Sequence, residues 1–144
     1  MRVVLASDHA GFALKEHLKS WLLESGGCGS VSDLGPSDED SVDYPDFAFA
    51  LCDEILSGRA DRGILVCNSG IGMSMAANRR KGIRAALCLF PDMAWFARHH
   101  NDANVMVLGG GMTGQFLARR ITEVFLRESF DGGRHGRRTG KLDS

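Results

Sequence analysis

The chain has 144 residues, of which 44% are hydrophobic, and its formal net charge is −1. This length suits one domain with a full hydrophobic core. The near-neutral charge argues against nucleic acid or a membrane surface as a partner, and no apolar run approaches the ~20 residues that a membrane span needs. The N-terminus has no signal-peptide pattern, so we expect a cytoplasmic protein.

Short apolar segments alternate with helical patterns along the whole chain. Strands are expected at residues 3–6, 31–34, 64–66, 83–88 and 105–108. Helices are expected over residues 12–22, 45–56, a segment through Ala76 and Ala77, a segment opened by Pro91, and 116–126. This alternation predicts one α/β domain over residues 1–144, a Rossmann-like three-layer α/β/α sandwich with a five-stranded parallel sheet.

Folds of this kind bind their ligands at the carboxyl ends of the strands. That rule selects the segments at residues 7–9, 67–72, around Phe90, and 109–111. The last segment of the chain, residues 131–144, is rich in Arg and Gly and has no core face. We expect it to be either a disordered tail or an arm that packs on another subunit.

The four cysteines are far apart in the sequence, and no pair has the C-x-x-C spacing of zinc or redox sites. We expect reduced thiols, and the usual role of an isolated cysteine is that of a small buried hydrophobe. Cys67 differs from the other three because it stands where a strand should end, before a glycine-rich turn and the start of a helix. Backbone N–H groups at such a turn point at an anion, and a thiol beside them can be held as thiolate.

Several known loops can be excluded for this segment. No Gly-Lys-Ser/Thr follows it, so it is not a Walker loop, and Met73 stands where a cysteine phosphatase needs an arginine. No G-x-G-x-x-G follows the first strand, which disfavours a dinucleotide. There remain the Cys67 thiol and the N–H donors from Asn68 to Gly72, an arrangement that suits an enolate-like oxyanion.

Asp8 and His9 directly follow the first strand. Asp8 could simply cap the first helix. Alternatively, the pair lies at the ligand-binding edge, where the imidazole of His9 could handle a proton of a sugar hydroxyl near neutral pH.

His99, His100 and Asn101 lie at the end of the fourth expected helix, where the helix dipole already favours such residues. Two adjacent histidines point about 100° apart on a helix, so at most one faces a given site. A zinc site is disfavoured because no pair of histidines has i, i+4 spacing.

The tail carries a compact group of cationic residues: Arg134, His135 and Arg138. By itself this group is typical of a solvated basic tail. Because Arg makes bidentate contacts with phosphate, a phosphorylated substrate would also explain it.

Together these segments resemble the type B ribose-5-phosphate isomerase family, which includes the galactose-6-phosphate isomerase subunits. The matching segments are spread in order over nearly the whole chain, at residues 7–11, 43–45, 63–78, 82–85, 100–105 and 132–135. The resemblance implies interconversion of an aldose phosphate and its ketose, with neither metal nor cofactor. Ribose 5-phosphate and ribulose 5-phosphate are the leading pair.

The resemblance also implies roles for individual residues. Cys67 matches the base that moves a proton between C1 and C2, His100 matches the residue that assists opening of the furanose ring, and Ser69 stands in the place of a catalytic Thr or Ser. The matching substrate contacts are Asp8, His9, Asn68, Gly70, Ile71, Gly72, Asn101, Arg134, His135 and Arg138. Family members are dimers or tetramers whose sites are shared between subunits, so a homodimer or homotetramer is expected.

The chain departs from the family pattern at two positions. Asn68 stands where the family commonly has glycine, and Gly111 stands where it usually has an arginine near the substrate. These departures leave open an isomerase of another phosphosugar, such as an allose, galactose or tetrose phosphate. They also leave open a regulator on the same fold that binds a phosphosugar without catalysis. A Cys–His hydrolase is a third alternative.

Overall fold

A computed structural model describes all residues 1–144. Its centre is one sheet of five parallel strands in the order β2-β1-β3-β5-β4. These strands are β1 (Arg2–Ser7), β2 (Ser30–Asp33), β3 (Arg62–Cys67), β4 (Ala85–Leu87) and β5 (Val105–Gly109). The predicted five-stranded parallel sheet is confirmed.

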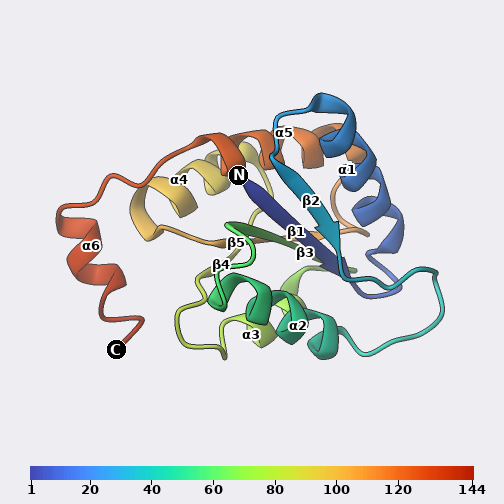
Figure 1. The fold of residues 1–144 in the computed structure, drawn as a ribbon, viewed down its shortest axis with the longest axis horizontal. Coiled ribbons are helices and arrows are strands. Elements are labelled where there is room, and N and C mark those ends of the chain that lie inside the picture. The colour runs from blue at the N-terminus through green and yellow to red at the C-terminus, as the bar shows by residue number, and fades with distance from the viewer.

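Helices cover both faces of the sheet (Figure 1). Helices α1 (Phe12–Ser25), α4 (Pro91–Asn101) and α5 (Gln115–Arg127) lie on one face, and α2 (Tyr44–Leu56) and α3 (Ile71–Ala77) lie on the other. The expected α/β/α sandwich is therefore confirmed. None of the helices combines the length and the apolar character required to cross a membrane.

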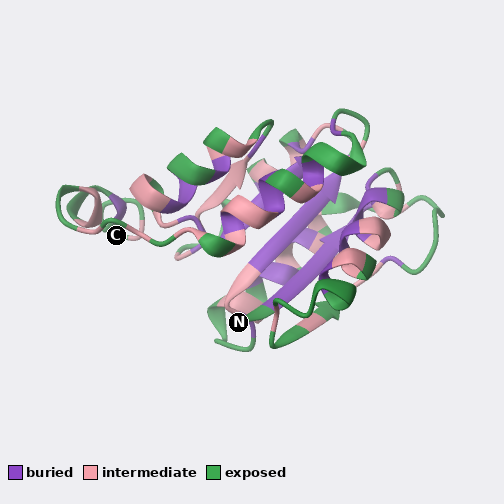
Figure 2. Ribbon diagram, turned by 90° about the horizontal axis from the view of Figure 1, so that it is seen from above, coloured by how far each residue is buried: buried purple, intermediate pink, exposed green.

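Two apolar layers hold the helices to the sheet, and the three central strands, β1, β3 and β5, are almost wholly buried (Figure 2). On one face, Leu18 and Phe125 pack against β1, β3 and β5, and on the other Leu51 and Met73 do the same. Because both faces of the sheet are covered, its central strands are continuous apolar runs instead of alternating ones. Strand β3 is one of these runs: it is buried from Gly63 onward and ends at Cys67.

Strand β4 is shorter than predicted. It covers Ala85–Leu87, whereas the apolar pattern extends over residues 83–88. The Arg84 N–H donates to the side chain of Asn104, which replaces a ladder hydrogen bond, and so the regular pairing begins one residue later.

The C-terminal segment is ordered against its own chain. A short helix, α6 (Arg134–Thr139), lies beside the end of α4 at the edge of the molecule (Figure 1). Thr139 is buried, and Asp143 forms an ion pair with Arg84. The expected alternative of a disordered tail is therefore not what the structure contains.

Candidate active site

The carboxyl ends of β1 and β3 form the central crevice of the sheet. These two strands are neighbours, and the sheet continues from β1 toward β2 but from β3 toward β5. Such a reversal of strand order opens a crevice in which α/β proteins bind ligands. The segments after β1 and β3 meet there, and the Asp8 N–H donates to the Val66 carbonyl at 3.1 Å.

Cys67 is the last residue of β3, and only 5% of its surface is exposed. Its Sγ accepts the N–H of Gly70 at 3.1 Å. Gly70 adopts φ 80°, a left-handed conformation that disfavours any side chain, and this bend turns its N–H back toward the sulfur. The predicted pairing of a strand-end thiol with backbone donors is thus present.

The other backbone N–H groups of this loop differ in whether they already have an acceptor within the protein. The Ile71 N–H donates to Ser69 Oγ at 3.2 Å, so it serves the loop itself. Gly72 is in the first turn of α3, where backbone N–H groups have no partner within the helix. Of the predicted anion donors, Gly72 is therefore free for a ligand, whereas Gly70 and Ile71 already have acceptors.

Asp8 and His9 are both held by the backbone. Asp8 Oδ1 accepts the Gly11 N–H at 2.9 Å in the turn before α1, and the side chain is buried. The N-cap of α1 is Gly11 and the helix has no side-chain cap, so the alternative that Asp8 caps this helix is wrong. His9 Nδ1 accepts the Val42 N–H at 3.2 Å. Because Nδ1 is an acceptor, Nε2 carries the ring proton of the neutral imidazole. His9 is thus oriented as a donor at the crevice.

The glycine segment after β5 lies directly against the loop after β3. The Gly110 N–H donates to the Cys67 carbonyl at 2.7 Å, and the Gly111 N–H donates to the Asn68 carbonyl at 2.9 Å. A Cβ on Gly109 would lie 2.8 Å from the backbone of Ser69. Glycines are needed here because the two backbones approach so closely. This set, Asp8, His9 and residues 67–72, is called the strand-end half-site below.

A second cluster surrounds the end of α4. The rings of His100 and His135 stack with centroids 4.2 Å apart and planes 6° apart. They border a hollow of about 360 Å³ that Asn101 and Arg138 also line. Arg134 and Arg138 are exposed, and neither pairs with a carboxylate. This set, His100, Asn101, Arg134, His135 and Arg138, is called the arm half-site.

The electrostatic environments of His99 and His135 differ. His99 contacts Glu128 Oε2 at 2.8 Å and Asp131 Oδ1 at 2.6 Å, and these carboxylates raise its pKa. Desolvation, and then the proximity of His100, lowers the pKa of His135. As expected for adjacent helical residues, His99 and His100 face different partners, and only His100 belongs to the half-site.

The arm half-site also contains potential metal ligands. Nitrogen or oxygen atoms of His100, Asp131 and His135 all lie within 4.8 Å of one another. However, the two stacked rings direct their nitrogen lone pairs along parallel planes, whereas metal ligands converge on one point. In addition, Asp131 Oδ1 is already bound to His99. We therefore assign no metal site here.

The two half-sites of one chain lie at opposite ends of the sheet. Helix α4 begins after the carboxyl end of β4 and runs back, so that His100 lies near the amino ends of the strands. There the Gly63 N–H donates to the Asn104 carbonyl at 2.9 Å. Gly63 and Cys67 are separated by ~13 Å at the usual strand rise. The structure therefore does not bring Cys67 and His100 together within one chain.

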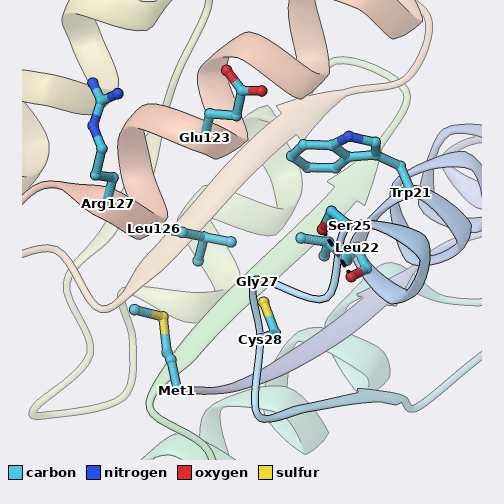
Figure 3. A pocket seen from close by; sticks show the side chains of 9 residues that line it. All are labelled: Met1, Trp21, Leu22, Ser25, Gly27, Cys28, Glu123, Leu126 and Arg127. Atoms are coloured by element: carbon cyan, nitrogen blue, oxygen red, sulfur yellow. Dashed lines mark hydrogen bonds between the residues drawn. The ribbon is translucent and has the colours of Figure 1, made fainter.

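Another hollow lies away from both half-sites (Figure 3). It has a volume of about 440 Å³ and lies between α1, α5 and the N-terminus, with Trp21, Cys28 and Leu126 in its wall. Met1, which precedes β1, also lines it, so this hollow is at the amino ends of the strands. It has no thiol–donor pair like that of Cys67, and ligands of this fold class bind at the other end.

Sequence reasoning missed Tyr44 and Val42. A Cβ on Gly72 would lie 2.8 Å from Tyr44 Cζ, so the tyrosine ring covers the start of α3. Val42 supplies the N–H that orients His9. Tyr44 belongs to one of the segments that carry the family resemblance, which was the available signal. Val42 acts through its backbone, so no side-chain pattern could identify it.

Comparison with known proteins agrees with this geometry. A family profile described as ribose/galactose isomerase matches residues 3–142. The chain belongs to this family. Ribose-5-phosphate isomerase B of Escherichia coli is 38% identical over 137 residues, which cover 95% of this chain and 91% of the relative.

Solved structures are similar over nearly the full length. A ribose 5-phosphate isomerase of Thermotoga maritima has 56% identity and a TM-score of 0.95, with 98% of this chain and 96% of that chain covered. The type B enzyme of Leishmania infantum has 45% identity and a TM-score of 0.93, covering 99% and 94%. The predicted family, its isomerase class and its phosphosugar type of substrate are thereby confirmed.

Proposed function

We propose that this isomerase converts ribose 5-phosphate to ribulose 5-phosphate, with Cys67 as the base. The observation that carries the proposal is the thiol at the end of β3, in the central crevice, with the Gly70 N–H directed at its sulfur. Relatives named for this reaction match the chain from end to end, which supports the choice of substrate. The roles of individual residues remain part of the proposal.

The chemistry begins with the open-chain aldose. Cys67, as thiolate, removes the proton from C2, and the electrons of the broken C–H bond form the C1–C2 double bond of a cis-enediolate. Negative charge then accumulates on O1, where the free N–H of Gly72 and the hydroxyl of Ser69 are available to it; one such donor is typically worth ~3 kcal/mol. Return of the proton to C1, with transfer of the O2 proton to O1, completes the ketose.

Ribose 5-phosphate is mostly a closed ring, so a second acid–base group has to open it. In the proposal His100 takes the proton of the anomeric hydroxyl as the C1–O4 bond breaks, and this same proton is then delivered to O4. Asp8 and His9 contact the sugar hydroxyls, and His9 presents its Nε2–H for that purpose. General acid–base assistance of this kind contributes typically 10²–10⁴-fold.

The phosphate contacts come from a second copy of the chain. Arg134 and Arg138 are exposed and free of carboxylate partners, so they can bind a phosphate bidentately. Because one chain holds its two half-sites at opposite ends of the sheet, we propose a dimer in which the arm half-site of each copy completes the strand-end half-site of the other.

Exposed apolar side chains flank both half-sites and support this assembly. Met112 and Phe116, just after the glycine segment, are 70% and 75% exposed, and Ile71 and Met75 of α3 are exposed as well. Beside His100, Phe96 is half exposed, with ring centroids 5.1 Å apart. Apolar surface of this kind is typical of an interface. An interface here also accounts for the exposure of Phe116, where the last helix expected from the sequence begins.

The base assignment is tested by Cys67→Ala. We expect its kcat to fall by roughly 10³–10⁴-fold, because a base has been removed while the fold is retained. The measurement is a coupled assay of ribulose 5-phosphate formation, together with the circular dichroism spectrum. Cys28→Ala, at the other end of the sheet, is the matched control and should keep wild-type turnover. A Cys67→Ala enzyme with more than a tenth of wild-type kcat would show that another group is the base.

A further inference from the structure

Asn68 and Gly111 compete for one volume at the rim of the strand-end half-site. A Cβ on Gly111 would overlap the Oδ1 atom of Asn68 and lie 3.2 Å from its Cγ. The side chain of Asn68 therefore occupies the space that any side chain at position 111 would need. Only one of the two positions can point a side chain into this space.

Backbone hydrogen bonds keep the two positions together. The Gly111 N–H donates to the Asn68 carbonyl at 2.9 Å, and the preceding Gly110 N–H donates to the Cys67 carbonyl at 2.7 Å. Neither segment can move away without breaking these bonds. A methyl group at position 111 would thus be accommodated by rotation of the Asn68 carboxamide out of its present orientation.

The carboxamide is free to bind a ligand. Asn68 is exposed, and its side-chain atoms have no hydrogen-bond partner within the protein, in contrast to Asn78 and Asn104, whose amides bind the backbone. It follows Cys67 directly, and with Cys67 as the proposed base this places it beside the reacting carbons of the substrate. A carboxamide both donates and accepts hydrogen bonds, as a hydroxyl does, and it carries no charge for a phosphate.

We propose that Asn68 is a specificity-determining residue that binds a sugar hydroxyl next to the reacting carbons, and that Gly111 holds it in place by leaving its volume empty. This inference rests on the proposed isomerase function. The two departures from the family pattern, at positions 68 and 111, then have one explanation. The side chain at the rim comes from position 68 instead of position 111.

The test is a double-mutant cycle with Asn68→Ala, Gly111→Ala and the double variant. For ribose 5-phosphate we expect KM to rise roughly five- to tenfold in Asn68→Ala, the usual effect of one lost hydrogen bond, with kcat changed less than about twofold. Gly111→Ala should raise KM similarly, because its methyl turns the carboxamide away. The double variant should match Asn68→Ala, since no carboxamide remains to be displaced.

Gly114→Ala is the matched control in the same segment. A Cβ there meets nothing within 4 Å, and its φ of −68° accepts any residue, so KM should stay at the wild-type value. A second readout is the ratio of kcat/KM between ribose 5-phosphate and xylose 5-phosphate, which differ at C3. The ratio of the two kcat/KM values should move toward one by the same factor in all three variants. A general loss of packing would instead lower kcat/KM for both sugars and leave their ratio unchanged.

The outcomes separate this inference from the function on which it rests. Wild-type protein that isomerises no pentose phosphate overturns the proposed function. Active wild-type protein whose cycle is additive, or whose KM and substrate preference do not change in Asn68→Ala, overturns the role of Asn68 alone. If Gly111→Ala unfolds, the double variant still decides. Its methyl no longer meets the carboxamide, and its nearest remaining neighbour is the carbonyl oxygen of residue 68, at 3.3 Å, so its KM must equal that of Asn68→Ala.

Discussion

The four thiols of this chain have different environments although none is disulfide-bonded. Burial raises the pKa of Cys52 to about 11 and that of Cys88 to about 12, and both side chains are completely inaccessible. They are the small buried hydrophobes that composition alone predicts for most cysteines. Cys67 is different because its sulfur is at a strand end and accepts a backbone N–H.

Alkylation of the native protein should distinguish these thiols. At pH 8 a thiol of pKa 11 is ionised in roughly one molecule in a thousand, so Cys52 and Cys88 should not react with iodoacetamide while the protein is folded. We expect loss of activity to follow modification of Cys67, measured by peptide mass spectrometry, and to be slowed by ribose 5-phosphate. Cys28→Ser removes the partly exposed thiol as a control. Modification of Cys52 or Cys88 ahead of Cys67 would contradict this account.

At the scale of elements, an ion pair fastens α1 to the edge strand β2. The side chain of Lys15 is fully buried, and its Nζ lies 2.6 Å from Asp33 Oδ2 and 2.7 Å from Glu16 Oε1. Burial acts to raise the pKa of Asp33, but hydrogen bonds from Lys15 and Lys19 outweigh it and lower this pKa to about 2. The folded protein thus favours the ionised form of Asp33.

Asp33→Asn should therefore destabilise the protein in a pH-dependent manner. At pH 6 we expect a loss of ~3 kcal/mol in the free energy of unfolding, because Lys15 keeps only Glu16 as a partner. A lowered pKa contributes stability above the unfolded value of 3.8, which is lost as pH falls toward 2. The difference between wild type and variant should thus shrink by ~2 kcal/mol between pH 6 and pH 2.

Urea unfolding at several pH values measures this difference. Asp61→Asn is a suitable control, because Asp61 forms its ion pair with Arg2 at the surface, where both side chains are exposed. Exposed pairs contribute less than ~1 kcal/mol. If Asp33→Asn lowers the free energy of unfolding as little as Asp61→Asn does, or by an amount that does not vary with pH, then the buried ion pair does not hold β2.

At the scale of the whole molecule, the separation of the half-sites is the feature that matters most. Cys67 is at the carboxyl end of β3, whereas His100 and α6 lie toward the amino ends of the strands. The expected arm of residues 131–144 packs against its own α4, with His135 stacked on His100. Arg134 and Arg138 of the arm are thereby held in one unit with His100 of α4. This separation supports the proposal that a second copy supplies the missing half.

Subunit mixing tests this arrangement. Cys67→Ala and His100→Ala dimers should each be nearly inactive on the furanose substrate. After the two are unfolded together and refolded, half of the dimers are mixed, and each mixed dimer has one intact site. Activity should therefore recover to roughly a quarter of the wild-type value. Recovery is measured by the coupled assay, with each variant refolded alone as the control, and no recovery would rule out a site shared in this way.

Local patterns in the sequence determined much of this protein: the alternation of strands and helices, the helix starts at Pro45 and Pro91, and the thiol that ends β3 before a glycine turn. These features depend on residues that are close together in the sequence, so they produce patterns that can be recognised in the sequence itself. Only the tertiary structure decided that Asn68 fills the space beside Gly111, that His135 stacks on His100, and that the two half-sites lie apart. Such contacts join segments that are far apart in sequence, so no local pattern records them.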